Sequence, residues 1–282
     1  MRDIIFLYNP LSHNKCGREM AEQSVQYITG TPKFEDITKI DNLTEFINNT
    51  APDTRLALVG GDGTLNNFVN RVDCDNLPRE ILYIPGGTGN DFFVDITNPS
   101  QKFIPLNQYI KNLPTVTVNG ITRKFLNGIG YGIDGYCCEI GDIQRASSDK
   151  PVNYAGIAIK GLLFHFKPRN ATITVDGVTK EIKKAWLCPT MKGRYYGGGM
   201  QIAPAQDRLD AEKKLTLVCM HGSGKLKTLI VFPGIFKGEH VKHKEMVEII
   251  TGKEFTVRFD KPCALQIDGD TVLNVSEYTV KA

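Results

Sequence analysis

The first third of the chain alternates short apolar runs with amphipathic stretches. The runs that predict buried strands are residues 3–8, 35–40, 55–59 and 81–85. The stretches whose apolar spacing predicts helices are residues 18–27, 43–49 and 64–71. Strands that alternate with helices favour a parallel α/β sheet, and ligands of such sheets bind at the carboxyl ends of the strands.

After Leu113-Pro114 the pattern changes to short β-rich runs separated by turn residues. These runs are residues 116–118, 123–126, 171–175, 182–188, 215–220, 255–259 and 264–267. We therefore expect an α/β domain over residues 1–113 and a β-rich domain over 114–282, whose last strand is free to return to the first domain. A helical stretch at 152–166 interrupts the β-rich part. Its apolar cluster, bounded by Lys160 and Lys167, suits either a membrane surface or packing against the sheet.

Composition places the chain among ordinary globular proteins. It has 282 residues, of which 41% are hydrophobic and 23% are charged, so a substantial core is expected and disorder is not. No apolar run approaches the roughly 20 residues that a bilayer-spanning helix needs. We expect a cytoplasmic protein.

Charge is divided unevenly along the chain. Residues 1–112 contain 10 basic and 14 acidic residues, whereas residues 113–282 contain 24 basic and 17 acidic ones. The basic second part suits a polyanion or the anionic face of a membrane, and scattered solvated lysines are the alternative interpretation. A nucleic-acid module would explain the basic part but not the glycine-rich turns described next.

Two glycine-rich turns each follow an apolar strand-like run. The first is Gly60-Gly61-Asp62-Gly63-Thr64, and the second is Pro85-Gly86-Gly87-Thr88-Gly89-Asn90-Asp91-Phe92. Glycine lets backbone N–H groups approach an anion, and a helix that begins just after the turn adds the positive end of its dipole. The pair predicts a phosphate-binding site.

At these turns the sequence resembles the diacylglycerol kinase catalytic domain family, which includes bacterial diacylglycerol kinases and is related to sphingosine and ceramide kinases. The N-terminal matching elements are Asn9-Pro10, the G-G-D-G-T-L-N-x-x-x-N stretch at 60–70 and the G-T-G-N-D-F motif at 87–92. The downstream elements are residues 127–130, 197–204, 238–240 and 268–270, in the order that the family has them.

The resemblance implies a two-domain NAD kinase/diacylglycerol kinase-like fold, with an N-terminal α/β nucleotide-binding domain and a C-terminal β-sandwich domain. It also implies transfer of the γ-phosphoryl group of ATP to a lipid hydroxyl with the help of Mg²⁺. The residues it places at the nucleotide are Asn9, Lys15, Gly60, Gly61, Asp62, Gly63, Thr64, Gly87, Thr88, Gly89, Asn90 and Asp91.

Two aspartates are candidates for catalysis. Asp62 brings a negative charge into a phosphate site, which fits contact with Mg²⁺, a ribose or an amide, or action as a base; capping of the following helix is the alternative. The family's proton acceptor is the last residue of a D-G-E motif, which here reads Asp268-Gly269-Asp270. Asp270 is therefore the expected general base, although Asp-Gly between two β-like runs is also a strong hairpin signal.

Metal ligands are expected at Asp91, and at Asp210 and Glu212 in a loop where bacterial members tend to have L-D-D-G and bind a structural Mg²⁺. Here the second acid and the glycine are displaced, and Lys213 and Lys214 follow. The opening loop also departs from the family, with Ser12-His13-Asn14 where a glycine is usual, which leaves the nucleotide affinity open.

The expected function is that of an ATP-dependent lipid kinase in phospholipid biosynthesis, with diacylglycerol as the acceptor. It would act peripherally at a membrane surface, with no nucleic-acid partner, and a homodimer stays open. The alternatives are a kinase for a soluble acceptor, similar to NAD kinase, and a nucleotide-binding regulatory protein without transfer activity.

Overall fold

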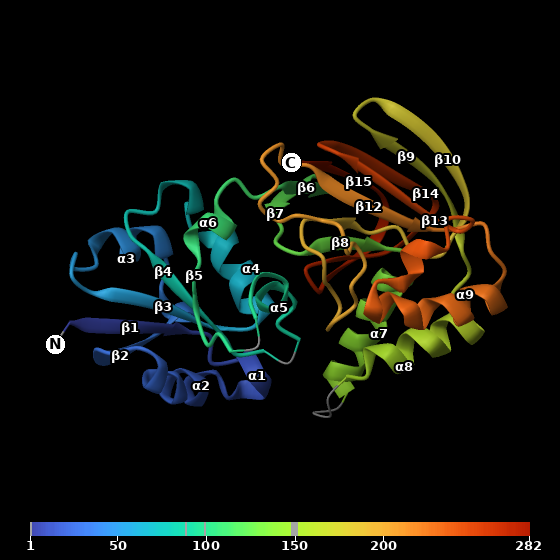
Figure 1. Cartoon of the computed structure of the whole chain (residues 1–282). Helices are drawn as coiled ribbons and strands as arrows, with labels where there is room; N and C mark the ends of the chain where they lie inside the picture. Colours follow the sequence, from blue (N-terminus) through green and yellow to red (C-terminus); the bar gives the residue numbers. More distant parts are fainter. Residues whose placement is uncertain (1, 88, 99, 148–151) are drawn as a thin grey trace. The chain divides into compact units, whose positions relative to one another are not determined.

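The computed structural model describes residues 2–87, 89–98, 100–147 and 152–282. The chain divides into two compact units, Met1–Leu113 and Pro114–Ala282. Figure 1 draws unit 1 from blue to green and unit 2 from green to red. Each unit has its own sheet and its own buried core.

Unit 1 is built on a sheet with the strand order β2-β1-β3-β4-β5. The strands are β1 (Asp3–Tyr8), β2 (Thr31–Asp36), β3 (Arg55–Gly60), β4 (Ile81–Pro85) and β5 (Ile104–Pro105). All neighbours are parallel except β5, which pairs antiparallel with β4. Because Tyr8 pairs with Val59 and Gly60 pairs with Pro85, the carboxyl ends of β1, β3 and β4 meet at one edge.

Helices lie between these strands along the chain (Figure 1). They are α1 (Ser12–Lys15), α2 (Gly17–Gln23), α3 (Leu43–Asn49), α4 (Asp62–Arg71), α5 (Asp91–Ile96) and α6 (Asn107–Ile110). Alternate residues of the central strands, such as Ile4, Phe6, Ala57 and Val59, are buried together with Ala21 of α2. This alternation follows from the period of two in a strand, which sends every second side chain to the same face.

The predicted strand at 35–40 is placed wrongly. Strand β2 runs from Thr31 to Asp36, and the 3-10 turn η2 (Ile37–Lys39) follows it. Pro32 is tolerated because β2 is an edge strand, where a missing N–H donor removes no ladder hydrogen bond from the sheet. The Asp36 carboxylate then accepts the N–H of Thr38 at 2.9 Å, which ends the strand.

Unit 2 is built on an antiparallel sheet with the order β13-β12-β11-β8-β14-β15-β6-β7, and β9 pairs with both β14 and β10. The strands are β6 (Thr115–Val118), β7 (Ile121–Lys124), β8 (Gly128–Tyr131), β9 (Arg169–Val175), β10 (Val178–Ala185), β11 (Thr190–Met191), β12 (Leu215–Met220), β13 (Val247–Gly252), β14 (Glu254–Ile267) and β15 (Asp270–Lys281). The last strand, β15, pairs with β14 and β6.

The predicted strands at 255–259 and 264–267 are parts of one strand, β14. Its register with β15 shifts between Arg258 and Cys263. Pro262 lies in this interval and has no N–H to donate to a ladder, so a local irregularity is expected there. On either side of it β14 pairs with β9 and with β8.

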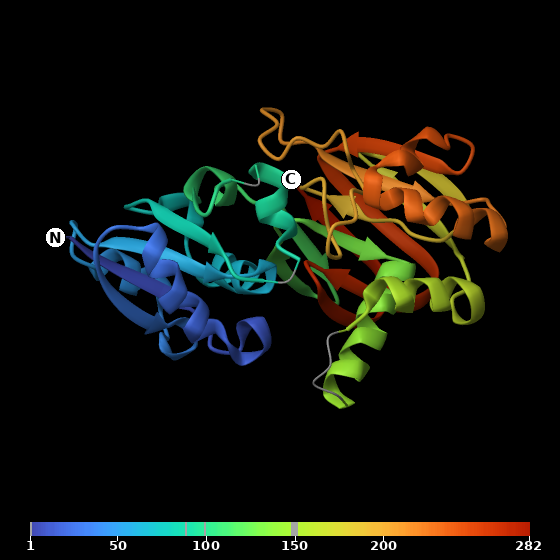
Figure 2. The ribbon, with the colours of Figure 1, turned by 60° about the horizontal axis from the view of Figure 1, so that its bottom comes forward.

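Helices of unit 2 pack on the sheet through a second cluster of buried side chains that includes Ile133, Leu162 and Trp186. They are α7 (Ile133–Ser147), α8 (Tyr154–Lys160), the π-helical turn η4 (Gly161–His165), α9 (Lys225–Val231) and the 3-10 helix η5 (Phe232–Lys237). Figure 2 shows α7, α8 and α9 on the same side of this β-rich unit. The helical stretch predicted at 152–166 corresponds to α8 and η4, whereas α7 and α9 were not predicted. Among the described helices, none combines the length and the apolar character that crossing a bilayer requires.

Candidate active site

The two glycine turns of unit 1 lie side by side at the carboxyl edge of its sheet. The N–H of Gly86 donates to the carbonyl of Gly60 at 2.9 Å. A Cβ built on Gly61 would come within 2.8 Å of Gly87 Cα, and one built on Gly87 within 2.7 Å of Gly61 Cα. Real Cβ atoms do not approach other atoms so closely. Glycine at both positions is therefore what lets the two backbones touch.

Asp62 joins the two turns. Its carboxylate accepts the N–H of Asp91 at 2.8 Å and the N–H of Phe92 at 2.9 Å, which are the first residues of α5. A carboxylate at this place satisfies orphan N–H groups of a helix start and interacts favourably with its dipole. Asp62 thus caps α5, which follows the second turn, in addition to being the first residue of α4.

The start of α4 presents backbone to open space. The first hydrogen bond of the helix runs from Leu65 N to Gly61 O at 3.0 Å, so the amides of Gly63 and Thr64 precede it. A Cβ built on Gly63 would meet nothing within 4 Å, whereas one on Gly60 would be 2.5 Å from Cβ of Thr64. Gly60 is thus needed for packing, and Gly63 leaves the helix start accessible to an anion.

The second turn is closed by its own asparagine. Asn90 lies in the left-handed region with φ 50°. Its side-chain oxygen accepts Gly87 N at 2.9 Å, and its side-chain nitrogen donates to Gly87 O at 2.7 Å. Gly89 is exposed, Asp91 is buried, and Thr88 lies outside the described residues.

Asn9 lies in the loop after β1, at the same edge of the sheet, whereas Lys15, expected in this loop, is the last residue of α1. Asn9 Oδ1 accepts the N–H of Leu11 at 2.9 Å, so its side chain forms a turn within the loop. A Cβ on Gly17 would lie 1.9 Å from the Asn9 carbonyl oxygen, so this loop packs directly on the start of α2. Lys15 is exposed, with φ 72°.

Two glycine substitutions separate packing from anion access. Gly63→Ala should raise the melting temperature slightly, because alanine is favoured over glycine in a helix by about 0.5–1 kcal/mol and its methyl group meets no atom. The same methyl group should lower ATP affinity at least about tenfold if phosphate occupies that space. Gly61→Ala should lower both quantities, because the turns must separate. Thermal denaturation and ATP titration of both variants check this, and unchanged ATP affinity in Gly63→Ala would contradict the assignment.

In unit 2, the Asp268-Gly269 pair forms the predicted hairpin turn between β14 and β15. Both residues have positive φ, 48° and 92°, as a two-residue type I′ turn requires. The Asp268 carboxylate accepts the backbone N–H groups of Leu126, Asn127 and Gly128 at 2.6, 2.8 and 3.0 Å. This aspartate therefore fixes the turn against the loop that precedes β8.

Asp270 follows this turn as the first residue of β15. Its carboxylate is 60% exposed and forms an ion pair with Arg123 of β7, Nη1 to Oδ2 at 3.0 Å. The other Nη atom of Arg123 donates to the carbonyl of Ile267 at 3.2 Å, which fixes the guanidinium beside the turn. The geometry holds an accessible carboxylate at a defined place, with a cation next to it.

The loop of Asp210 and Glu212 is held by contacts within itself. Asp210 accepts the backbone N–H groups of Lys214 at 2.8 Å and Glu212 at 3.3 Å, and Glu212 pairs with the Lys214 ammonium at 2.5 Å. The Lys214 contacts are also the main cause that lowers the pKa values of both acids. Within the described ranges, no group of three histidine, cysteine or acidic residues is arranged to hold a metal ion.

An unusual carboxyl group lies at the start of α7. Asp134 is 6% exposed, and Oδ1 accepts the hydroxyl of Tyr196 at 2.7 Å. Its Oδ2 has no hydrogen-bond partner in the described part of the chain and lies near Gly130, where a Cβ would be 2.9 Å away. Burial raises the pKa of Asp134 to about 7, so this group is protonated in mildly acidic solution.

Asp134 should make stability depend on pH. Its folded-state pKa of about 7 lies above the unfolded value of 3.8, so the folded chain binds more protons between these values. The free energy of unfolding should then fall as pH rises from about 4 to about 7, by roughly 1.4 kcal/mol for each pH unit at most. Asp134→Asn mimics the protonated acid and should remove this fall, making the variant the more stable protein at pH 8. Urea unfolding at pH 5 and pH 8 measures it, and parallel pH profiles for both proteins would contradict it.

Arg123, Asp134 and the three contacts of Asp268 were not predicted from the sequence. The Arg123–Asp270 pair joins residues 147 positions apart, and no local pattern signals it. For α7 a signal existed, because the small or apolar residues Ile133, Cys137 and Gly141 recur every four positions and are buried. Because cysteine and glycine are only weakly hydrophobic, this spacing did not lead to a helix prediction.

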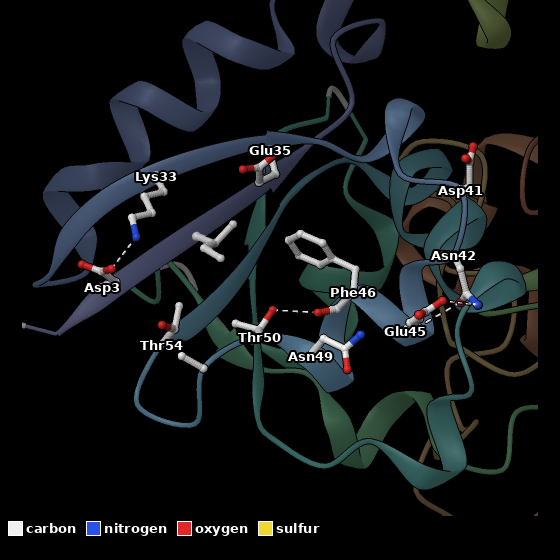
Figure 3. Close-up of a pocket in the computed structure, with 12 residues that line it drawn as sticks. Asp3, Lys33, Glu35, Asp41, Asn42, Glu45, Phe46, Asn49, Thr50 and Thr54 are labelled. Carbon is white, nitrogen blue, oxygen red and sulfur yellow. Dashed lines mark hydrogen bonds and ion pairs between the residues drawn. The ribbon is translucent and has the colours of Figure 1, made fainter.

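A separate hollow in unit 1 lies away from the glycine turns. Figure 3 shows it between β1, β2 and α3, with Asp3, Glu35, Asp41 and Glu45 around it and Lys33 paired with Asp3 at 2.5 Å. The residues that β1 contributes, Asp3 and Ile5, come from the amino-terminal part of that strand, and the lining contains no residue of either glycine turn. The excess of acidic side chains disfavours phosphate there.

Downstream family motifs pack together in unit 2. A Cβ on Gly238, which has φ 68°, would be 3.1 Å from Oε1 of Gln201 and 3.2 Å from Pro204. The buried ring of His240 lies 2.9 Å from the carbonyl of Ile202 through Nε2. The runs 197–204 and 238–240 thus support each other's backbone.

Comparison with known proteins agrees with these arrangements. The model of the diacylglycerol kinase catalytic domain matches residues 3–120, and that of the YegS C-terminal NAD kinase beta sandwich-like domain matches residues 127–279. A diacylglycerol kinase of Mycobacterium tuberculosis is 28% identical over 222 residues, which cover 76% of this chain and 69% of that protein. A diacylglycerol kinase crystal structure from Bacillus anthracis aligns with a TM-score of 0.61 at 17% identity, over 99% of this chain and 94% of the other. The expected family and fold are thereby confirmed: this chain belongs to the diacylglycerol kinase catalytic domain family, with an N-terminal α/β domain and a C-terminal β-sandwich domain.

Proposed function

We propose that this protein transfers the γ-phosphoryl group of ATP to a lipid hydroxyl, with diacylglycerol as the acceptor. The observation that carries the proposal is the direct backbone contact of the two glycine turns, joined by Asp62, at the carboxyl edge of a parallel sheet. Two adjacent turns, each followed by a helix, suit the several phosphate groups of a nucleotide better than one turn would.

The nucleotide is assigned to the residues of these turns. Backbone N–H groups of Gly61, Gly63 and Thr64 would bind phosphate oxygens, supported by the open space at Gly63. The second turn, from Gly87 to Asp91 with Asn90 inside it, would contact the nucleotide from the adjoining backbone. Asn9, in the loop after β1, and Lys15, at the end of α1, complete the assignment.

We assign a Mg²⁺ ion to the bound nucleotide and Asp91 as its protein ligand. The backbone of Asp91 contacts the Asp62 carboxylate. Mg²⁺ in kinases is usually held by one or two carboxylates together with substrate phosphates, so a dedicated cluster of three acids is not required. When bound, the ion would neutralise the negative charge that develops on the phosphate oxygens during transfer. The Asp210 and Glu212 loop stays a sequence-based prediction for a second ion.

Asp270 is assigned as the proton acceptor for the attacking hydroxyl. It is exposed enough to meet a substrate, and Arg123 and the clamped Asp268-Gly269 turn hold it in place. The aspartate side chain is one methylene shorter than the glutamate that is usual in the family. Its carboxylate must therefore be positioned by the backbone of the turn and by the ion pair with Arg123.

A lipid acceptor is favoured by the relative from Mycobacterium tuberculosis, whose name is diacylglycerol kinase. We also propose that this protein is cytoplasmic, acts peripherally on a membrane and contributes to phospholipid biosynthesis. The competing acceptor is a soluble alcohol or NAD.

Transfer of labelled phosphate from ATP tests the proposal. The purified protein is incubated with diacylglycerol, sphingosine or ceramide in mixed micelles, or with NAD and glycerol in solution, each with and without Mg²⁺. We expect Mg²⁺-dependent labelling of diacylglycerol above the other acceptors. Equal labelling of the soluble alcohols would reject a lipid kinase, and ATP binding without turnover on any acceptor would favour a regulatory protein.

A further inference from the structure

Exposed apolar side chains gather on one set of neighbouring elements in unit 2. Among the side chains that the structure describes, fifteen large apolar ones are exposed, and six of these belong to α8, η4, α9 and η5. These six, which we call the apolar face, are Ile159, Leu163, Phe164, Leu226, Ile230 and Phe236. Such a concentration in two short segments is not the scatter expected of isolated surface residues.

The two segments that carry the apolar face lie side by side. The ammonium of Lys225, at the start of α9, donates to the carbonyl of Leu163 in η4 at 2.7 Å. Leu226 and Ile230 are four residues apart on α9, so they lie on one side of that helix. Figures 1 and 2 both show α9 running beside the α8 segment.

Packing inside the unit leaves a large part of these side chains exposed. The inner sides of the same elements are already occupied by buried residues, including Ile157, Leu162 and Val231. A Cβ on Gly161 would be 2.6 Å from the Tyr136 ring, so η4 is pressed tightly onto α7. Phe164, Leu226 and Ile230 are nevertheless 73%, 74% and 72% exposed. Residues 152–166 were expected either to lie on a membrane surface or to pack against the sheet. Packing accounts for the inner side of these elements only.

Within the two segments that carry the apolar face, every charged residue is basic. Residues 154–169 and 222–237 contain no aspartate or glutamate. Their basic residues are Lys160, Lys167, Arg169, Lys225, Lys227 and Lys237. Of the ion pairs within the described ranges, the one that involves these cations joins Lys227 to Glu245 at 2.8 Å. Exposed apolar residues flanked along the chain by basic residues suit an anionic bilayer.

We propose that the apolar face is the membrane-docking surface of this protein, and that its partner is a bilayer containing anionic phospholipid. Phe164, Leu226 and Ile230 would enter the boundary between headgroups and acyl chains while the flanking lysines remain at the headgroups. The choice of a bilayer as partner rests on the proposed function, because a lipid acceptor is met at a membrane.

Vesicle flotation of the full chain tests the docking surface. The vesicles are phosphatidylcholine alone, or phosphatidylcholine and phosphatidylglycerol in roughly a 2:1 ratio. We expect the wild type to float with the anionic vesicles, and the double variant Leu226→Ser/Ile230→Ser to bind about tenfold more weakly. Lys160→Ala/Lys237→Ala should weaken binding and reduce its dependence on salt. Val178→Ser is the matched apolar control, because Val178 is 75% exposed on β10, and Lys183→Ala is the basic control.

The outcomes separate this inference from the proposed kinase. Absence of wild-type binding to anionic vesicles, or equal loss in the control variants, would overturn the docking surface. If the wild type were a dimer and the variant Leu226→Ser/Ile230→Ser a monomer with unchanged vesicle binding, the apolar face would be a self-association surface instead. Transfer of phosphate to a short-chain, monomeric diacylglycerol needs no bilayer. Retained transfer with failed flotation therefore rejects the docking surface alone, and flotation without transfer rejects the kinase alone.

Discussion

Asp270→Asn should lower kcat by about 100- to 10,000-fold while the Kd for ATP stays unchanged. Transfer to a hydroxyl requires a proton acceptor, and general-base catalysis typically contributes a factor of this size. Asparagine has the same shape and keeps the Oδ1 acceptor, so the hairpin of β14 and β15 should be unaffected. The Arg123 ion pair is lost, but the guanidinium keeps its hydrogen bond to the Ile267 carbonyl. Steady-state transfer to diacylglycerol and ATP titration measure the two quantities.

Asp260→Asn serves as the control, because Asp260 is an exposed aspartate of β14 outside the turn. It should retain wild-type turnover. If Asp270→Asn also retained it, Asp270 would not be the base, and the Asp268-Gly269-Asp270 turn would be a hairpin of structural importance only.

Asp62→Asn should lower both stability and activity. An asparagine oxygen can accept one of the two N–H groups at the start of α5, but its NH₂ group then faces the other donor. Hydrogen bonds to charged groups contribute about 1.5–3 kcal/mol each, so the free energy of unfolding of unit 1 should fall by about 2 kcal/mol. Because the second glycine turn leads into α5, kcat/KM for ATP should fall at least about 100-fold.

Thermal denaturation and transfer kinetics measure the effect of Asp62→Asn. Asp53→Asn, at an exposed aspartate before β3, is the matched control and should change neither quantity. A variant at Asp62 with wild-type melting temperature and wild-type kcat/KM would show that the link between the turns is dispensable, which this account does not allow.

Much of unit 1 was predictable because its signals are local. The apolar runs at β1 and β4 and the helix at α3 were predicted with the bounds that the structure has. A glycine turn directly after a parallel strand must lie at the carboxyl edge of the sheet, so the shared location of the two turns also followed from the sequence. The contact of Gly61 with Gly87, and the two N–H groups on Asp62, depend on side-by-side register and could not be read from either motif alone.

Unit 2 was less predictable because its key contacts are distant in sequence. Arg123 meets Asp270, and Asp268 meets the backbone of Leu126, each across about 140 positions. The predicted strand at 123–126 also lies too late, since β7 runs from Ile121 to Lys124 and the following residues bind Asp268 instead. The Asp268 carboxylate, which accepts the backbone N–H of Leu126, determines where the strand ends, and Asp268 lies near the other end of the chain.

The central claim is that the paired glycine turns hold the phosphates of a nucleotide. Amide NMR spectra of the isotope-labelled protein during titration with Mg²⁺ and ATP test it most directly, because they report on the backbone N–H groups themselves. We predict that the largest shifts fall on Gly61, Gly63 and Thr64 and on the turn from Gly87 to Asp91. Shifts that instead gather around the hollow of Figure 3, at Asp3, Glu35 and Glu45, or that are absent at saturating ATP, would contradict the account.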